Sequence, residues 1–209
     1  METKHIRTYL LTDSIVFRKT KEEFGGLSNM ASGFSIKIND VVIPSAEHLY
    51  QACRFPDYPN LQWDIIQQHS PMNAKWVSRA NTKLTRSDWD SVRFKIMQWV
   101  LEVKLSQNWE KFSCLLLQTE KKPIVEASPK DKVWGAVRDG NCFVGINALG
   151  RLLMLVRNEY VYKLKHNRCV QPLAIENFLF LGNKIDMICV DEYADHDCTN
   201  FYDNILQLH

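Results

Sequence analysis

Apolar residues recur at helical spacing over the longest periodic stretch of the chain, which runs from Ser87 to about Ser106. Val92, Ile96 and Val103 are four and seven residues apart, so they lie on one face of an α-helix. Ser87 can cap this helix, and the acidic residues that follow it suit the first turn. The pattern predicts a helix of about 20 residues, roughly 30 Å long, whose apolar stripe lies in the core.

Shorter periodic stretches predict five further helices. Ser45 is placed to cap the first of them, and Pro56 and Pro59 end it. Ser70 followed by Pro71 is typical of a helix start. The predicted helices are the one after Ser45 and those at Leu61–His69, from Pro71 to about Ala80, at Trp109–Gln118 and from about Ala148 to Asn158.

Short strands are predicted between the helices. Apolar and polar residues alternate over 34–38, and Asn39 and Asp40 separate them from the apolar residues 41–43, a pattern typical of a β-hairpin. Gly182 and Asn183 lie between two apolar runs and predict a second hairpin. The glycines of 135–150 favour turns there over a long regular element. Further strands are predicted at Tyr9–Phe17 and Pro123–Ala127.

The chain has 209 residues, of which 45% are hydrophobic and 24% charged, as is typical of a globular protein. A chain of this length can bury a substantial core without disulfides or metal. The pattern changes after Tyr160, so we interpret 1–160 as one domain and 161–209 as a C-terminal extension packed on it. The expected fold class is an α-rich α+β domain.

Charge and cysteine content restrict the class of protein further. The net charge of +2 neither indicates nor excludes a nucleic-acid-binding protein. The six cysteines form no CxxC motif, and the N-terminus has no signal-like apolar run, which indicates reduced thiols in a cytoplasmic protein. His166 with Cys169 and His196 with Cys198 are too weak a pattern to predict zinc. No run of about 18 apolar residues predicts a membrane span.

Two pairs of charged or polar residues have the spacing of one helix face. Glu47 and Gln51 are four residues apart. With Ser45 as the cap, Glu47 lies in the first turn, where the helix dipole favours an ionised carboxylate, so it suits a base or charge stabiliser better than an acid. Lys75 and Arg79 are also four apart; such pairs usually face solvent, but they can also clamp a phosphate.

Several other candidates also have structural interpretations. Asp131 follows a predicted buried strand in a turn, where binding groups concentrate. His48 is more often a buried, hydrogen-bonded histidine than a base, and Trp89 is more often a core residue than a stacking platform. Gly25 and Gly26 suit either a turn or a close approach to a ligand. Taken alone, these residues indicate an anionic-ligand site but no reaction. Asp88 is more often a helix-start residue than a catalyst. The remaining candidates are Glu126, Trp134 and Asn147.

Six stretches carry a resemblance to a known family. In order they are FGGLSNMASGF, IPSAEHLYQACRF, PMNAKWVSR, RSDWDSVRFKIMQWVLEVKLSQN, LLLQTEKKPIVEASPKDKVWG and GINALGRLLMLVR. Together they resemble the NADAR superfamily, which is named for NAD and ADP-ribose and includes the YbiA-like N-glycosidases. The resemblance runs from about Phe24 to Arg157. One stretch alone is a weak signal, whereas six in the right order are specific.

The resemblance implies a compact, mainly helical α+β domain that cleaves N-glycosidic bonds and needs no cofactor or metal. Members hydrolyse phosphorylated ribosyl intermediates of riboflavin synthesis, or remove ADP-ribose from modified guanine in nucleic acid. Carried onto this chain, the pattern implies catalytic roles for Glu47, Lys75 and Asp131. It also places Arg79, Trp89, Trp134 and Asn147 at active-site positions, and we predict that these bind substrate together with Gly26, Asn29, His48, Gln51 and Gly135.

These residue types suit the implied chemistry. Glu47 or Asp131 would stabilise the cation-like sugar formed when a ribose–nitrogen bond breaks. Lys75 offers a second route, because a lysine amine can form a Schiff base with the aldehyde of an opened ribose. Arg79 would bind phosphate, and Trp89 or Trp134 would stack on a base.

Two positions depart from the family pattern and leave the substrate open. Ser78 stands where family members usually have a glycine before the arginine. Ala136-Val137 stands where they often have a second glycine after the Trp-Gly pair. The favoured hypothesis is an enzyme that removes ADP-ribose from guanine in DNA or RNA. The alternatives are a glycosidase of riboflavin-pathway ribosylamino-pyrimidine phosphates and a non-catalytic module that binds ADP-ribose. No membrane partner is expected.

Overall fold

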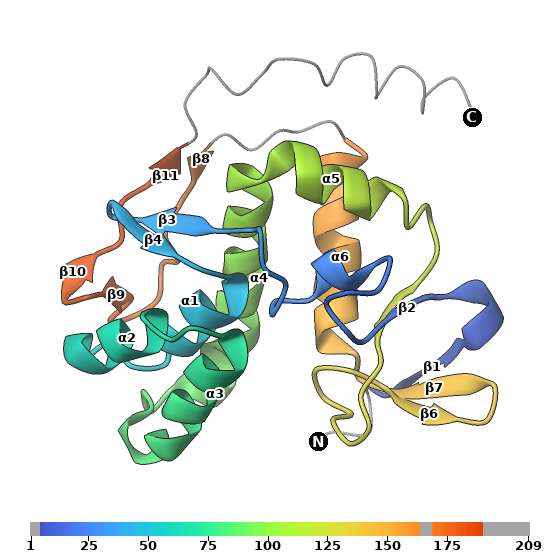
Figure 1. Cartoon of the computed structure of the whole chain (residues 1–209), viewed down its shortest axis with the longest axis horizontal. Helices are drawn as coiled ribbons and strands as arrows, with labels where there is room; N and C mark the ends of the chain where they lie inside the picture. Colours follow the sequence, from blue (N-terminus) through green and yellow to red (C-terminus); the bar gives the residue numbers. More distant parts are fainter. Residues whose placement is uncertain (1–4, 164–168, 190–209) are drawn as a thin grey trace.

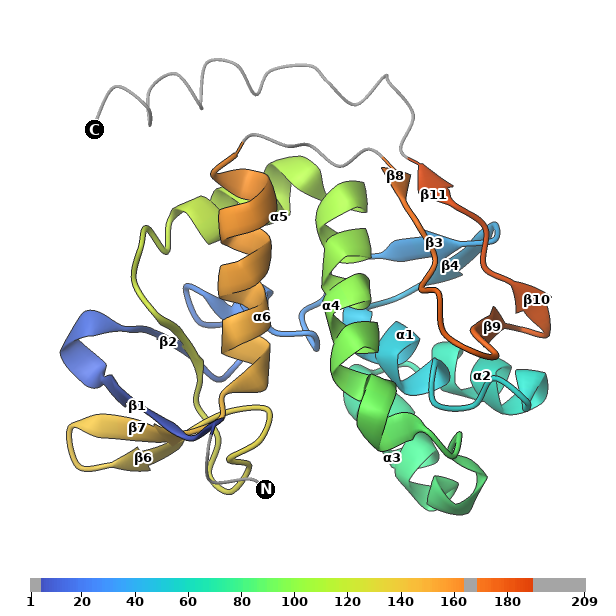
Figure 2. The same ribbon diagram turned by 180° about the vertical axis from the view of Figure 1, so that it is seen from behind.

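The computed structural model describes residues 5–163 and 169–189. Its axis is the long helix α4 (Trp89–Gln107), which lies between two groups of elements (Figure 1). Helices α1, α2 and α3 lie on one side of α4, and α6 with the small β1-β7-β6 sheet lies on the other; the reverse view agrees (Figure 2). The long helix predicted from periodicity is confirmed. Its flanking residue is Asp88 rather than Ser87, and the Asp88 carboxylate binds Arg86 instead of capping the helix.

The other predicted helices are also present. Helix α2 begins at Pro59 rather than Leu61, because proline is tolerated in the first turn of a helix. Ser70 caps α3 by accepting a hydrogen bond from the Asn73 amide, as its position predicted. The bounds are α1 Ala46–Ala52, α2 Pro59–Ile66, α3 Pro71–Ala80, α5 Trp109–Leu117 and α6 Ala148–Val156, which continues as a π turn at Arg157–Val161.

The first predicted strand is wrong in extent, since 9–17 holds two strands. Strands β1 (Arg7–Leu10) and β2 (Ile15–Phe17) are separated by a 3-10 turn. Strand β1 pairs antiparallel with β7 (Cys142–Gly145), whereas β2 pairs parallel with β5 (Ile124–Glu126). The turn lets two strands that are adjacent in the sequence join different sheets.

The glycine-dense region also contains a two-strand hairpin that the sequence did not predict. Strand β6 (Val137–Asp139) pairs antiparallel with β7. Gly140 has a φ of 56° in the turn that joins them, a conformation that glycine adopts without steric cost. Gly140 therefore forms the turn between two regular strands.

The two predicted hairpins are confirmed. Strands β3 (Ile36–Ile38) and β4 (Val41–Ile43) pair antiparallel, and Asn39 and Asp40 between them both have positive φ angles of 46° and 64°. Such angles fit the turn that Asn-Asp sequences favour in hairpins. The second hairpin is formed by β9 (Leu179–Phe180) and β10 (Asn183–Lys184), and it is flanked by the paired strands β8 (Cys169–Val170) and β11 (Ile188–Cys189).

The cysteines correct one expectation. Cys169 and Cys189 face each other in the β8–β11 pair and form a disulfide, so the prediction of reduced thiols is wrong for this pair. Strand pairing explains the contact, because it joins two positions 20 residues apart that sequence spacing does not connect. Cys53, Cys114 and Cys142 are free. His166 and the His196–Cys198 pair lie outside the described residues.

One hydrophobic cluster fills the space around α4 and extends into the segment after residue 160. It joins residues of α1, α4 and α6 to Val161, Val170, Phe178 and Phe180. A second, smaller cluster lies between β1, β5 and β7. Across residues 5–163 and 169–189, the helices are all too short or too polar to cross a membrane.

Candidate active site

A cavity of about 990 Å³ opens beside the N-terminal half of α4. It is lined by the loop 28–30, by α1 and α3, by the loop 82–87 before α4, and by the loop 126–134 after β5. These segments come from five parts of the chain, and the packing of α4 against α1 and α6 brings them together. Pockets for small ligands usually have volumes of about 300–1,000 Å³, so this cavity can hold a nucleotide-sized molecule.

Glu47 lines the cavity and is only 5% exposed. Its backbone amide donates to the carbonyl of Asn29, which joins α1 to the loop 28–30. Its Oε1 accepts a hydrogen bond from Gln51 Nε2 at 2.8 Å and lies 3.6 Å from Lys75 Nζ. The expected shared face of Glu47 and Gln51 is present, and Lys75 reaches the same oxygen from α3.

Two buried acceptors beside Glu47 have no hydrogen-bond partner among the described residues. They are Gln51 Oε1 and Asn29 Oδ1, on side chains that line the cavity. Both residues are 4% exposed, and Asn29 Nδ2 already donates to Met97 Sδ. Because buried polar atoms are nearly always paired in proteins, these two acceptors are polar groups next to Glu47 whose hydrogen bonds the described residues do not satisfy.

Glu126, at the end of β5, also lines the cavity. Burial, and after it the negative charge of Glu47, raise the pKa of this carboxyl to about 7. Asn147 fixes the strand end: its Oδ1 accepts from the Glu126 amide at 3.1 Å, and its Nδ2 donates to the Ile124 carbonyl at 2.8 Å. A carboxylic acid that is partly protonated at neutral pH therefore lies in the same cavity as Glu47.

Asp131 lines the cavity from the loop after β5, where it organises the backbone. Its Oδ1 accepts hydrogen bonds from the amides of Val133 at 2.8 Å and Trp134 at 2.9 Å. Its own amide donates to Ser128 Oγ. Asp131 thus positions the backbone of Trp134.

Aromatic rings form one wall of the cavity. Tyr50 packs between Trp89 and Trp134, with ring centroids 5.2 and 5.5 Å away. Phe94 packs on the far side of Trp134 at 5.0 Å. The two tryptophans proposed as stacking residues therefore belong to one cluster, and Tyr50 on α1 connects them.

Arginines lie beside this aromatic wall. Arg54 donates to Ser78 Oγ and Thr85 Oγ1, both at 3.1 Å, and its guanidinium lies 5.2 Å from the Trp89 ring centroid. Ser78, one of the two departures from the family pattern, thus holds a cation at the cavity. The other cationic residues that line it are Arg18, Lys75, Arg79, Arg86 and Arg93.

Four of the proposed binding residues do not line the cavity. His48 is fully buried, its ring lies between Ser45 Oγ and the Gln68 carbonyl, and burial lowers its pKa. Gly26 is packed where a Cβ would meet Leu115, and its carbonyl accepts from the buried Lys104. The others are Gly135, where a Cβ would meet the Glu126 carbonyl, and Asn147.

The remaining proposed residues do line the cavity, but sequence reasoning did not select several of their neighbours. Arg54 follows the end of α1, so helical spacing cannot predict which way its side chain points. Its place at the cavity is explained by its hydrogen bonds to Ser78 and Thr85. Glu126 was a candidate by position alone, and its buried surroundings distinguish it here. In the described part of the chain, no three His, Cys, Asp or Glu side chains are grouped to hold a metal ion.

Comparison with known proteins identifies the family. The sequence model of the NADAR domain matches residues 16–160. The N-glycosidase YbiA of Escherichia coli is 34% identical over 152 residues, covering 72% of this chain and 91% of YbiA. The riboflavin biosynthesis protein PYRR of Zea mays is 38% identical over 162 residues, and the match spans 71% of this chain but a quarter of the maize protein (25%).

The fold agrees with the sequence comparison. The NMR structure of E. coli YbiA superimposes with a TM-score of 0.62, at 34% identity, over 74% of this chain and 90% of that one. The mainly helical α+β fold expected from the resemblance is thereby confirmed. The protein therefore belongs to the NADAR domain family, together with the N-glycosidase YbiA.

Proposed function

We propose that this NADAR-family N-glycosidase removes ADP-ribose from ADP-ribosylated guanine in nucleic acid. The observation that carries the proposal is the arrangement of two unlike groups in one cavity. Glu47, Lys75 and Glu126 form the first group, and an aromatic wall with arginines beside it forms the second. The first suits cleavage of a ribose–nitrogen bond, and the second suits a diphosphate and a base.

The two glutamates suit complementary roles. As the bond between C1′ and the base nitrogen breaks, its electron pair leaves with the base and the sugar becomes cation-like; the ionised Glu47 stabilises that charge. Glu126, with its pKa raised to about 7, gives its proton to the departing nitrogen. Water then adds to C1′ and returns one proton to Glu126. The raised pKa of Glu126 suits it to the acid role beside the carboxylate of Glu47.

Lys75 offers the alternative route. Its Nζ lies 3.6 Å from Glu47 Oε1, so it approaches the same carbon that the carboxylate would stabilise. The neutral amine would attack C1′ as the bond to the base nitrogen breaks, and the base would leave with a proton. The resulting ribosylamine would open to an imine between C1′ and Nζ, and addition of water to that imine would release the sugar and the free amine. Reduction with cyanoborohydride during turnover distinguishes the routes, because only the imine leaves the sugar covalently attached to Lys75.

Substrate recognition uses the rest of the cavity. Gln51 Oε1 and Asn29 Oδ1 accept hydrogen bonds from the ribose hydroxyls, which supplies the partners these buried atoms lack. Arg54 and Arg79 bind the diphosphate, since guanidinium groups match phosphate oxygens well. Trp89 and Trp134 stack on a base, and Asp131 sets the position of Trp134.

A second candidate substrate is the ribosylamino-pyrimidine phosphate of riboflavin synthesis. The match to the maize protein named for riboflavin biosynthesis favours it, although that match spans a quarter of the maize protein (25%). This smaller substrate carries one phosphate, so it would leave part of the arginine group without a partner. The size of the cavity and the number of its arginines therefore favour the ADP-ribosyl substrate.

A substrate panel tests these alternatives. Wild-type protein is incubated with single-stranded DNA that carries ADP-ribosylguanine and, separately, with the ribosylamino-pyrimidine phosphate, and released sugars are measured by mass spectrometry. Release of ADP-ribose from the DNA supports the proposal. Release only from the pyrimidine would establish the second candidate, and binding of ADP-ribose without release from either would show a non-catalytic module.

A further inference from the structure

Residues 169–189, here called the C-terminal strap, lie outside the NADAR match of residues 16–160 but are fixed to its surface. The strap follows the side of the molecule formed by α2, β3 and β4 (Figures 1 and 2). Its buried residues, such as Phe178, belong to the main core, where the Phe178 ring meets Trp99 edge-on at 4.9 Å. Four side chains of the matched part also form hydrogen bonds with the strap's backbone, namely those of Asn39, Gln62, Arg86 and Trp99.

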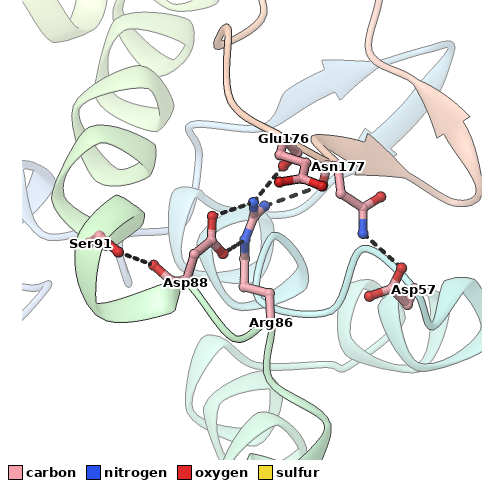
Figure 3. A network of polar contacts seen from close by, with 6 residues as sticks. All are labelled: Asp57, Arg86, Asp88, Ser91, Glu176 and Asn177. Atoms are coloured by element: carbon pink, nitrogen blue, oxygen red, sulfur yellow. Dashed lines mark hydrogen bonds and ion pairs between the residues drawn. The ribbon is translucent and has the colours of Figure 1, made fainter.

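Arg86 is the one of these four anchors that also lines the cavity. Its Nη2 donates to the Glu176 carbonyl at 2.6 Å, and its Nη1 donates to the Asn177 carbonyl at 3.3 Å (Figure 3). The guanidinium also binds both oxygens of Asp88, at 2.5 and 3.0 Å. Arg86 is 8% exposed, so the two strap carbonyls supply half of the acceptors of a buried cation.

The backbone of Arg86 is joined to two residues of the proposed substrate site. Its amide donates to the Arg54 carbonyl at 2.9 Å, and its carbonyl accepts from the Trp89 amide at 3.2 Å. The preceding residue, Thr85, accepts from Arg54 Nη2. The position of Arg86 therefore determines where the Arg54 side chain and the Trp89 ring lie in the cavity.

We propose that the C-terminal strap is a positioning element for substrate binding. By holding the Arg86 guanidinium through the Glu176 and Asn177 carbonyls, it fixes the loop 82–88, which orients Arg54 and Trp89. The inference rests on the proposed function of the cavity and adds that substrate affinity depends on a segment outside the NADAR match. Because the strap does not line the cavity, it affects binding rather than the chemical step.

Asn177 allows this inference to be tested with a matched pair of variants. Its φ of 50° lies in the left-handed region, which asparagine and glycine tolerate and β-branched residues do not. Its Nδ2 also donates to Asp57 Oδ1 at 2.7 Å (Figure 3). Asn177→Val and Asn177→Gly both remove that hydrogen bond, but only Asn177→Val forces the backbone and its carbonyls to move.

Steady-state kinetics with the full chain and ADP-ribosylated single-stranded DNA measure the effect. We expect Asn177→Val to raise KM about tenfold, a change of about 1.4 kcal/mol, with kcat within about twofold of wild type. We expect KM of Asn177→Gly to stay within about threefold. In an Arg86→Met background, Asn177→Val should change KM little further, because the strap would then have no guanidinium to hold.

Hydrogen exchange tests the strap without reference to any substrate. Asn177→Val should speed exchange of the Arg86 and Trp89 amides about tenfold, whereas Asn177→Gly should not, with circular dichroism confirming the fold. If Asn177→Val does not fold, Asn177→Ala replaces it, since a Cβ alone disfavours the left-handed conformation.

The outcomes separate the strap from the proposed function. Unchanged KM and unchanged amide exchange in a folded Asn177→Val protein would show that the strap only extends the core. An equal increase of KM with and without Arg86 would show that it acts by another path. If wild type neither binds nor cleaves the substrate, the proposed function fails, and amide exchange alone decides whether the strap holds Arg86.

Discussion

Replacing Glu47 by glutamine removes a charge and almost nothing else. The Glu47 side chain is buried, and its Oε1 accepts from Gln51 at 2.8 Å, a bond that an amide oxygen can also accept. The ion pair with Lys75 at 3.6 Å is lost, but Lys75 is 31% exposed and can be solvated. We therefore expect Glu47→Gln to change the free energy of unfolding by no more than about 1 kcal/mol.

The expected effect on turnover is far larger. A negative charge about 4 Å from a developing positive charge contributes about 4 kcal/mol at an effective dielectric constant of about 20. An amide oxygen at the same place carries only a fraction of that charge. Loss of most of this energy from the transition state lowers kcat roughly a thousandfold. Glu47→Gln should thus keep the fold and lose the reaction.

The assay follows release of ADP-ribose over time, with urea unfolding measured on the same samples. The matched control is Glu102→Gln, because Glu102 on α4 also accepts from a glutamine four residues away, Gln98, but does not line the cavity. We expect kcat of this control to stay within about twofold of wild type. A Glu47→Gln protein that keeps kcat within tenfold of wild type would contradict stabilisation of the cation-like sugar by the Glu47 charge. The leading catalytic role would then belong to Lys75 or Asp131.

Three further predictions concern neighbouring residues. The folded-state pKa of Glu126 is raised to about 7, so its contribution to stability is complete below about pH 4.5 and is lost as the pH rises through 7. Urea unfolding should show a loss of at most about 3 kcal/mol over this range, and Glu126→Gln should make stability less dependent on pH. The kcat of wild type should also fall above pH 7, because Glu126 then loses the proton that it donates. Ser78→Ala removes an acceptor of Arg54 and should raise KM about fivefold with little change in kcat, whereas an unchanged KM would count against a binding role for Arg54. Asn147→Ala removes both hydrogen bonds to β5 and should lower the free energy of unfolding by about 3 kcal/mol. A decrease below about 1 kcal/mol would contradict the role of Asn147 in fixing the end of β5.

Local patterns predicted the elements whose formation depends on neighbours in the sequence. Three such signals predicted their elements correctly: the apolar period of α4, the Asn39-Asp40 turn and the serine before α3. Each signal lies within a few residues of the structure that it specifies. The shared face of Glu47 and Gln51 follows for the same reason. The resemblance to the NADAR family then connected Glu47 to distant residues that spacing alone could not.

Features that depend on contacts between distant segments were not predicted. Pairing of β8 with β11 brings Cys169 to Cys189, and no spacing rule marks that disulfide. The raised pKa of Glu126 results from burial by other segments together with the charge of Glu47. Arg54 becomes a candidate binding group only when α3 places Ser78 beside it.

The most direct test of the central claim uses a single-stranded DNA oligonucleotide that carries one ADP-ribosylated guanine. Wild-type protein is added, and the masses of the oligonucleotide and of the released sugar are followed over time. We expect unmodified oligonucleotide and free ADP-ribose to appear in equal amounts. An oligonucleotide that stays modified when the protein is in excess would contradict the claim.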